Sequence, residues 1–508
     1  MLGLIFGFIR RIIERSRIRR QIRNINRQNE EGKHVVEYHD APVETYVSKE
    51  RIENIIASGN NKYIRDRVSC AAAYNAYKLG NPVIVLHCGN EQLEHMLEDA
   101  FSSESGLHIV NGTNKNYDPF LDLDKHQIAQ LVLSSANDSC KIQHNGGVYI
   151  KGLTDYLLAR SNTPCASSYI RCPHDDMWRR VGEHARNGDI SQAVAKEIND
   201  QISMGLVERG NVEQYFRVLN SQAGCILANR EAMNSDSAIS IRRAINKNDV
   251  IAIDVVSSSN DLLLNVLVQE IRDAMSGGRR FVFILDSIPV DASEALGRLL
   301  RNFSNRCKFV YTSYDTYSDT IGTESLFDTL LGKANTVFVT QHDSASSSEK
   351  FSKYFGKYQK VEINNTITSG DSYATFDQIL PGSSTANVYS MQHVDRPRVE
   401  ESEITGLEMN RVLIKKEGRN DIISVRCSNG SPVETYSEPR RRQVNAPSTR
   451  TFNWGIFILL FIFFYPAAFV YGFITSGRRG KIVFGILTLV GVAFIITTTV
   501  LEYSGLLA

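Results

Sequence analysis

Residues Phe281–Pro289 read FVFILDSIP, five apolar residues in a row that lead to an aspartate. A short run that is apolar throughout is typical of a strand buried on both faces of a parallel sheet. In such sheets ligands bind beyond the carboxyl ends of the strands, so Asp286 stands where chemistry is expected. The stretch predicts an α/β fold and marks one edge of its sheet as the place to look for a site.

Further runs of this kind lie on both sides, separated by segments with a helical pattern. The predicted strands are Ile52–Ala57, Asn81–His87, Leu107–Asn111, Val250–Val256, Lys308–Thr312 and Thr336–Thr340. The predicted helices between them include Arg65–Leu79, Asp261–Met275 and Ala292–Asn302. This alternation predicts a mostly parallel sheet with crossover helices. Val412–Lys416 and Ile422–Arg426, on either side of Gly418, predict a late hairpin.

These patterns divide the chain into six parts. No strand-like run occurs between about residues 125 and 240, which predicts an all-helical insertion. The segment that follows the late hairpin is rich in polar residues, arginine and proline, as linkers often are. The predicted parts are 1–30, a basic helix; 45–125 and 245–427, the α/β domain; 126–240, the insertion; 428–453, the linker; and 454–501, a membrane hairpin.

Two segments near the C-terminus carry no charged residue over a length that can cross a bilayer. They are Trp454–Ile474, with 21 residues, and Ile482–Leu501, with 20 residues. Spanning the hydrocarbon core takes about 20 apolar residues in a helix. Thr475–Lys481 between them is short enough for a tight turn. The sequence predicts a two-helix transmembrane hairpin that holds nearly all of the chain on one side of a membrane.

The N-terminal segment suggests which side that is, since basic residues before the first span and in the turn nearly balance. Residues 1–27 contain eight arginines and one glutamate, interleaved with isoleucines. The apolar start, Met1–Ile9, lacks the basic region and cleavage site of a signal peptide. We expect a basic amphipathic helix on the anionic inner leaflet, or alternatively a solvated or partner-docking helix. Both alternatives keep the N-terminus in the cytoplasm. Together with the hairpin they predict a multi-pass protein of the cell membrane with a cytoplasmic body.

Composition excludes some classes of protein. The 508 residues include 57 basic and 56 acidic ones, so no overall basic field favours nucleic acid, and only local charge can. Eight dispersed cysteines without a CxxC pair fit a reducing compartment better than a disulfide scaffold. The spacing of Cys165, Cys172 and His174 matches no standard zinc site, and His174–Asp176 suits the start of a helix. We predict no metal site here.

The order of segments along the body resembles the conjugative type IV coupling proteins of the TraG/TraD type, within the FtsK–HerA branch of RecA-like P-loop ATPases. The resemblance covers about residues 50–426. The matching segments are Tyr117–Phe120 (YDPF), the Walker B-like strand ending at Asp286, Asn335–Thr336, Phe351–Lys357 and the late hairpin Val412–Arg426. It implies a RecA-like sheet with an all-helical insertion, ATP and Mg²⁺ as cofactors, and a role in DNA or protein transfer.

Four nucleotide-handling positions depart from that family. At the P-loop position the sequence is SGNNKYIRDR, which keeps Gly59 and Lys62 around Asn60 and Asn61 but lacks the GxxxxGK[ST] pattern that cradles phosphates. Ser287 stands where the family has the glutamate after Walker B, and Ser313 where it has a sensor glutamine. The family's Asp-Lys-Gly-type turn is replaced by the sequence HCGN, residues 87–90. Each lost group should remove about 3 kcal/mol of transition-state stabilisation, which predicts a pseudo-ATPase.

Few residues remain as candidates for chemistry. Asp286 is the residual Walker B residue, and Arg298 and Arg301 lie where the family can place a trans-acting arginine. The alternatives are a plain strand-end aspartate and an ordinary exposed helix face. Lys62 suits a surface lysine better than a phosphate ligand.

Three hypotheses follow. The first is a membrane-anchored, non-catalytic scaffold or adaptor that works with type IV secretion or conjugation components, active paralogues or further copies of itself. The second is a working ATP-driven DNA or protein translocase with an unusual P-loop. The third is an inner-membrane interaction protein unrelated to DNA. The resembling family carries its membrane helices before the motor domain, whereas here the predicted spans follow it.

Overall fold

The computed structural model of the chain describes residues 20–39, 41–160, 162–228, 237–256, 260–290, 293–303, 305–371 and 383–427. The chain divides into two compact units, Met1–Pro439 and Arg440–Ala508, and the described residues all belong to the first. The predicted linker and transmembrane hairpin, and residues 1–19 of the predicted basic helix, lie outside the described residues. Among the residues described, no helix is long and apolar enough to cross a membrane.

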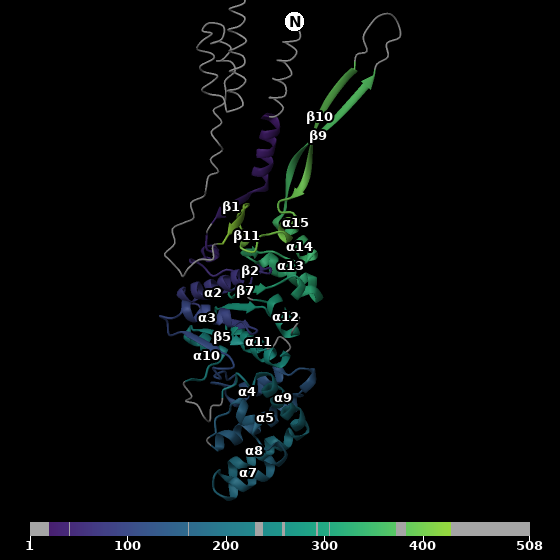
Figure 1. Cartoon of the computed structure of the whole chain (residues 1–508). Helices are drawn as coiled ribbons and strands as arrows, with labels where there is room; N and C mark the ends of the chain where they lie inside the picture. Colours follow the sequence, from purple (N-terminus) through teal and green to yellow (C-terminus); the bar gives the residue numbers. More distant parts are fainter. Residues whose placement is uncertain are drawn as a thin grey trace, which may run out of the picture. The chain divides into compact units, whose positions relative to one another are not determined.

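A ten-stranded sheet forms the centre of the described chain, in the order β1-β12-β11-β8-β2-β7-β6-β3-β5-β4 (Figure 1). All neighbours from β8 to β4 pair in parallel, while β11 is antiparallel to both β8 and β12. This confirms the predicted mostly parallel α/β sheet. The strands are β1 (Val35–His39), β2 (Ile55–Ser58), β3 (Val83–His87), β4 (Leu107–Val110), β5 (Val250–Asp254), β6 (Val282–Asp286), β7 (Lys308–Ser313), β8 (Thr336–Val339), β11 (Arg411–Lys416) and β12 (Ile422–Arg426).

Helices cover both faces of this sheet because its strands are apolar on both sides. Along β3, Val83 and Val85 belong to one core cluster, while Ile84 and Leu86 belong to the other. The first cluster includes α2 (Lys62–Lys78) and α3 (Glu91–Ala100). The second cluster includes α11 (Asp261–Ser276), α12 (Glu294–Arg301), α13 (Glu324–Lys333) and α14 (Ala345–Phe355), together with helices of the region between β4 and β5. The short helix α15 (Glu401–Thr405) precedes β11.

Between β4 and β5 the described chain is helical apart from turns and short bridges. Its core contains stacked aromatic rings, with the ring centroids of Tyr169 and Phe216 4.8 Å apart. The helices are α4 (Lys125–Ser135), α5 (His144–Ala159), α6 (Ala166–Ile170), α7 (Met177–Arg186), α8 (Gln192–Met204), α9 (Arg209–Ala223) and α10 (Ile241–Lys247).

A second, two-stranded antiparallel sheet is absent from the sequence-based prediction. It pairs β9 (Lys357–Asp371) with β10 (Ser383–Pro397). The two strands contain few apolar residues, so they carry no signal of a buried strand. A helix over residues 20–33, the described part of the predicted basic helix, packs at the base of this sheet. There the Asn29 side chain accepts a hydrogen bond from Val361 N at 2.8 Å and donates one to Val361 O at 3.0 Å.

Candidate functional site

The carboxyl ends of the central parallel strands bring polar residues into one row. In the strand registers His87 lies beside Asp286, Asp286 beside Thr312, and Ser58 beside Ser313. All five of these side chains are buried. The predicted placement of Asp286 and Ser313 at one edge of the sheet is therefore observed, and the edge is densely packed.

The loop at the predicted P-loop position is short and tied to β8. It consists of three residues between β2 and α2, and the last of them, Asn61, caps α2 by accepting a hydrogen bond from Ile64 N at 3.0 Å. Gly59 has a φ of +124°, and a side chain there would place its Cβ 2.8 Å from the carbonyl oxygen of Gln341. Asn60 N donates to the same carbonyl at 2.8 Å. Three residues pinned in this way cannot form the wide turn of amides that surrounds a phosphate chain.

The buried cation of this edge is Arg65, and not Lys62, which the sequence favours as a surface lysine. Lys62 is the exposed first residue of α2. Arg65 lies one turn further on, is buried, and donates from Nη1 to the carbonyl oxygen of Gly59. Burial lowers the pKa of the Arg65 guanidinium, and the negative charges of Asp286 and Asp66 oppose that shift. The arginine therefore supplies a fixed internal positive charge at the mouth of the loop.

Asp286 uses both of its carboxylate oxygens inside the protein. Oδ1 accepts a hydrogen bond from Thr312 Oγ1 at 2.6 Å, and Oδ2 accepts one from Asn90 Nδ2 at 2.7 Å. Thr312 Oγ1 in turn lies 3.3 Å from Ser69 Oγ of α2. The side chain is fully buried. A carboxylate that binds Mg²⁺ needs an oxygen directed at the ion, whereas both oxygens here face neutral donors.

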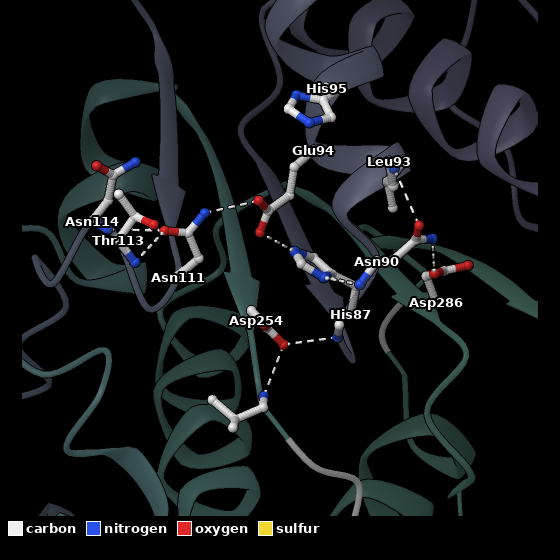
Figure 2. A network of polar contacts seen from close by, with 12 residues as sticks. His87, Asn90, Leu93, Glu94, His95, Asn111, Thr113, Asn114, Asp254 and Asp286 are labelled. Atoms are coloured by element: carbon white, nitrogen blue, oxygen red, sulfur yellow. Dashed lines mark hydrogen bonds and ion pairs between the residues drawn. The ribbon is translucent and has the colours of Figure 1, made fainter.

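Asn90 connects this aspartate to a second one, Asp66, and Figure 2 shows its contact with Asp286. It is the N-cap of α3, where its Oδ1 accepts from Leu93 N at 3.2 Å. Its Nδ2 group donates to Asp286 and also to Asp66 Oδ1 at 2.8 Å. Asp66 Oδ2 is buried and has no hydrogen-bond partner among the described residues. Burial accordingly raises the pKa of Asp66 to about 6, although the hydrogen bond from Asn90 opposes the shift.

The network continues from Asn90 toward β4 (Figure 2). Asn90 N donates to His87 Nδ1 at 3.3 Å, which requires the ring proton to sit on Nε2. His87 Nε2 lies 3.3 Å from Glu94 Oε1, and Asn111 Nδ2 donates to Glu94 Oε2 at 2.8 Å. Burial raises the pKa of Glu94, but the contacts with His87 and Asn111 outweigh it and hold that pKa below its usual value. These groups bind one another, so the edge behaves as a packed polar core.

Ser287 and Ser313 both lie at the carboxyl ends of strands, beside Asp286 and Thr312. Ser287 directly follows Asp286 with a φ of +56°, and its amide donates to the carbonyl oxygen of Thr312 at 2.8 Å. Ser313 donates its hydroxyl to Asp319. A serine hydroxyl is neither a base that can activate water nor a carboxamide that can sense a phosphate. The residues of this edge therefore do not fit a nucleotide with its Mg²⁺ ion.

The other sequence-based candidates lie away from this edge. Arg298 pairs with Glu294 at 2.7 Å on the exposed side of α12, and the carbonyl oxygen of Arg301 accepts from Lys333 Nζ at 2.9 Å. In the described part of the chain, neither arginine forms a hydrogen bond or ion pair with the strand-end residues. His174 is buried against Tyr169, whose carbonyl oxygen lies 3.0 Å from Nε2.

Sequence reasoning missed the two residues that organise the edge, Arg65 and Asn90. A charged residue in the first turn of a helix is normally exposed, and no local pattern shows that Arg65 is buried. The sequence HCGN at the end of β3 differs from the turn of the resembling family, but this difference does not reveal the role of Asn90. That Asn90 caps α3 could have been found, since asparagine before a helical run is an N-cap signal.

The raised pKa of Asp66 predicts a pH-dependent stability. In the unfolded chain an aspartate has a pKa of about 3.9, so between pH 4 and 6 only the folded state retains the proton. The contribution of Asp66 to the free energy of unfolding is then fully present below pH 4. It is lost as the pH rises through 6, and the loss is about 3 kcal/mol at most. Asp66→Asn removes this contribution and keeps an oxygen for Asn90. We expect the variant to gain stability relative to the natural chain between pH 4.5 and 7.5, in urea unfolding followed by circular dichroism. A difference that stays constant over that pH range would contradict the assignment.

Comparisons with known proteins give matches at the level of structure alone. No protein-family model and no curated protein sequence matches the chain. An unbound form of the bacterial conjugative coupling protein TrwB matches with a TM-score of 0.42 and 11% identity, over 77% of this chain and 91% of that one. TrwB in complex with ADP and Mg²⁺ matches with a TM-score of 0.42 and 11% identity, over 80% of this chain and 95% of that one. VirB4 of Thermoanaerobacter pseudethanolicus matches with a TM-score of 0.39 and 11% identity, over 78% of this chain and 96% of that one. With identities this low, the chemistry of the site rests on the residues described above.

Proposed function

We propose that the chain is a membrane-anchored, non-catalytic relative of the conjugative coupling ATPases, which acts as a scaffold or adaptor in DNA or protein transfer. One observation carries the non-catalytic part: both oxygens of Asp286 are engaged by Asn90 and Thr312. The groups that would handle a nucleotide instead hold the fold together. The proposed role is therefore one of assembly and not of turnover.

The chemistry of phosphoryl transfer supports this proposal. Hydrolysis of ATP needs a cradle of amides, a hydroxyl on Mg²⁺ and a residue that positions water. Here the loop has three residues, α2 opens with Lys62 and Tyr63, and Ser287 follows the aspartate. Each missing group costs about 3 kcal/mol of transition-state stabilisation, so two of them slow the reaction about 10⁴-fold.

The membrane part of the proposal rests on sequence. Two uncharged segments, 454–474 and 482–501, suit a hairpin in the cell membrane, with the body on the cytoplasmic side. The arginine-rich start of the chain is a second contact with the inner leaflet. Its described part exposes Arg20, Arg23 and Arg27. The link to transfer rests on the order of motifs along residues 50–426, and its partners are transfer components or active paralogues.

Nucleotide assays of the purified full chain test the non-catalytic part. We expect no saturable ATP binding by calorimetry and no Mg²⁺-dependent phosphate release above a protein-free blank. Lys62→Ala is the matched variant, because this exposed lysine can be removed without disturbing the fold. Robust turnover that disappears in Lys62→Ala or Asp286→Ala would overturn the proposal and establish an active translocase with an unusual P-loop.

A further inference from the structure

A second site lies where the helical region meets the sheet. A cleft of about 660 Å³ is lined by residues of α4, α10 and α11 and of the turn after α11. Figure 1 shows these helices at the lower end of the sheet. Sites for small molecules have volumes of about 300–1,000 Å³ and often form where domains join. Since α10 leads into β5 and Arg279 lies three residues before the start of β6, the cleft lies at the amino ends of the strands, the edge opposite Asp286.

Two arginines from different elements face this cleft, and each is held in place by a neighbour. Arg242 Nη2 of α10 lies 3.3 Å from Asp273 Oδ2, and Arg279 Nη2 donates to Asn246 Oδ1 at 3.1 Å. The Nε and Nη1 groups of Arg279 have no hydrogen-bond partner among the described residues, and neither does the ring of His126. Two arginines against one aspartate leave the lining positive. The two guanidinium groups are held by Asp273 and Asn246 before any ligand arrives, which lowers the cost of binding an anion.

The rest of the lining limits the kind of anion. Leu123, Ile245 and Ala274 add an apolar part to the cleft, and Gln130 adds an amide. A terminal phosphate carries more negative charge than a carboxylate and has three strong acceptor oxygens. A phosphate is therefore the anion best suited to a lining with two arginines and His126.

From this geometry we infer that the cleft between α4, α10 and α11 binds a small phosphorylated molecule through Arg242 and Arg279. The apolar residues and Gln130 contact the remainder of the ligand. This site is separate from the strand-end network and does not depend on the proposed function.

Calorimetric titration of the full chain with sodium pyrophosphate, in buffer with 150 mM salt, tests the inference. We expect saturable binding that weakens about tenfold in Arg279→Ala, because hydrogen bonds to charged groups are lost. Arg280→Ala is the matched control, since this adjacent arginine is exposed but does not line the cleft. Asp273→Asn should tighten binding, because it frees Arg242 and removes the negative charge of the lining.

Four results would overturn the inference. The first is no saturable binding of pyrophosphate by the natural chain. The second is equal weakening by Arg279→Ala and Arg280→Ala, which indicates general attraction to positive charge. The third is that the chain binds a 20-nucleotide single strand but not pyrophosphate, and that Arg279→Ala weakens this binding. That result would assign the cleft to a nucleic-acid backbone. Binding that is lost in Lys62→Ala and kept in Arg279→Ala would place the phosphate at the loop after β2, against both this inference and the proposed function.

Discussion

Replacing Arg65 with alanine is expected to lower the free energy of unfolding by about 3–5 kcal/mol, the usual cost of removing one partner from a buried set of charges. The substitution leaves Asp286 and Asp66 without their internal cation and leaves the Gly59 carbonyl without the guanidinium donor. The free energy of unfolding of Arg65→Lys should lie between those of the natural chain and Arg65→Ala, since lysine keeps the charge but cannot reproduce the planar guanidinium group.

Urea unfolding of the full chain measures this effect, with Arg298→Ala as the matched control. Arg298 pairs with a carboxylate, Glu294, and its side chain is 60% exposed. Exposed pairs of this kind contribute about 0.3–0.5 kcal/mol. If the two alanine variants lost equal stability, Arg65 would not be the internal charge that holds this edge.

Asn90→Asp is expected to have an effect of similar size, about 3–5 kcal/mol at pH 7.5, for the opposite electrostatic reason. The natural amide donates to Asp286 at 2.7 Å and to Asp66 at 2.8 Å. An aspartate in its place brings a third negative group to a buried pair and removes both hydrogen bonds. The oxygen that caps α3 remains, so helix capping itself is preserved.

The pH dependence and a control separate charge from shape in this experiment. The loss should shrink below pH 5, where the crowded carboxyl groups take up protons. Asn114→Asp makes the same chemical change at an exposed position near the far end of the network and should stay within about 0.5 kcal/mol. A loss at position 90 that does not change with pH would point to shape alone.

Most strands of the ten-stranded sheet were predictable because they are short, largely apolar runs, whereas β1, with the sequence VVEYH, was not predicted. Phe281–Leu285 and Val250–Val256 need no tertiary information to be recognised, and the structure places strands there within about two residues. The β9–β10 sheet could not be predicted in this way, because few of its residues are apolar.

The candidate site was predictable in position but not in its contacts. The rule that ligands bind at the carboxyl ends of parallel strands selects Asp286, Ser313 and the loop at Gly59. The bond from Asn90 to Asp286 requires knowing that β3 lies beside β6, although about 200 residues separate them along the chain. Arg65 was missed for the same reason, since only the packing of α2 over the strand ends buries it.

The contact between Asn29 and Val361 has a consequence for register in β9 and β10. Two-stranded sheets with polar residues on both sides resist slippage poorly, because no buried face distinguishes one alignment from the next. A carboxamide that accepts from the N–H and donates to the C=O of a single residue acts as a short piece of adjoining strand. Along a strand edge, successive residues turn these groups to opposite sides, so a slip of one residue breaks both bonds. The N-terminal helix thereby fixes the position of β9, the first strand of a pair whose own sequence specifies its alignment weakly.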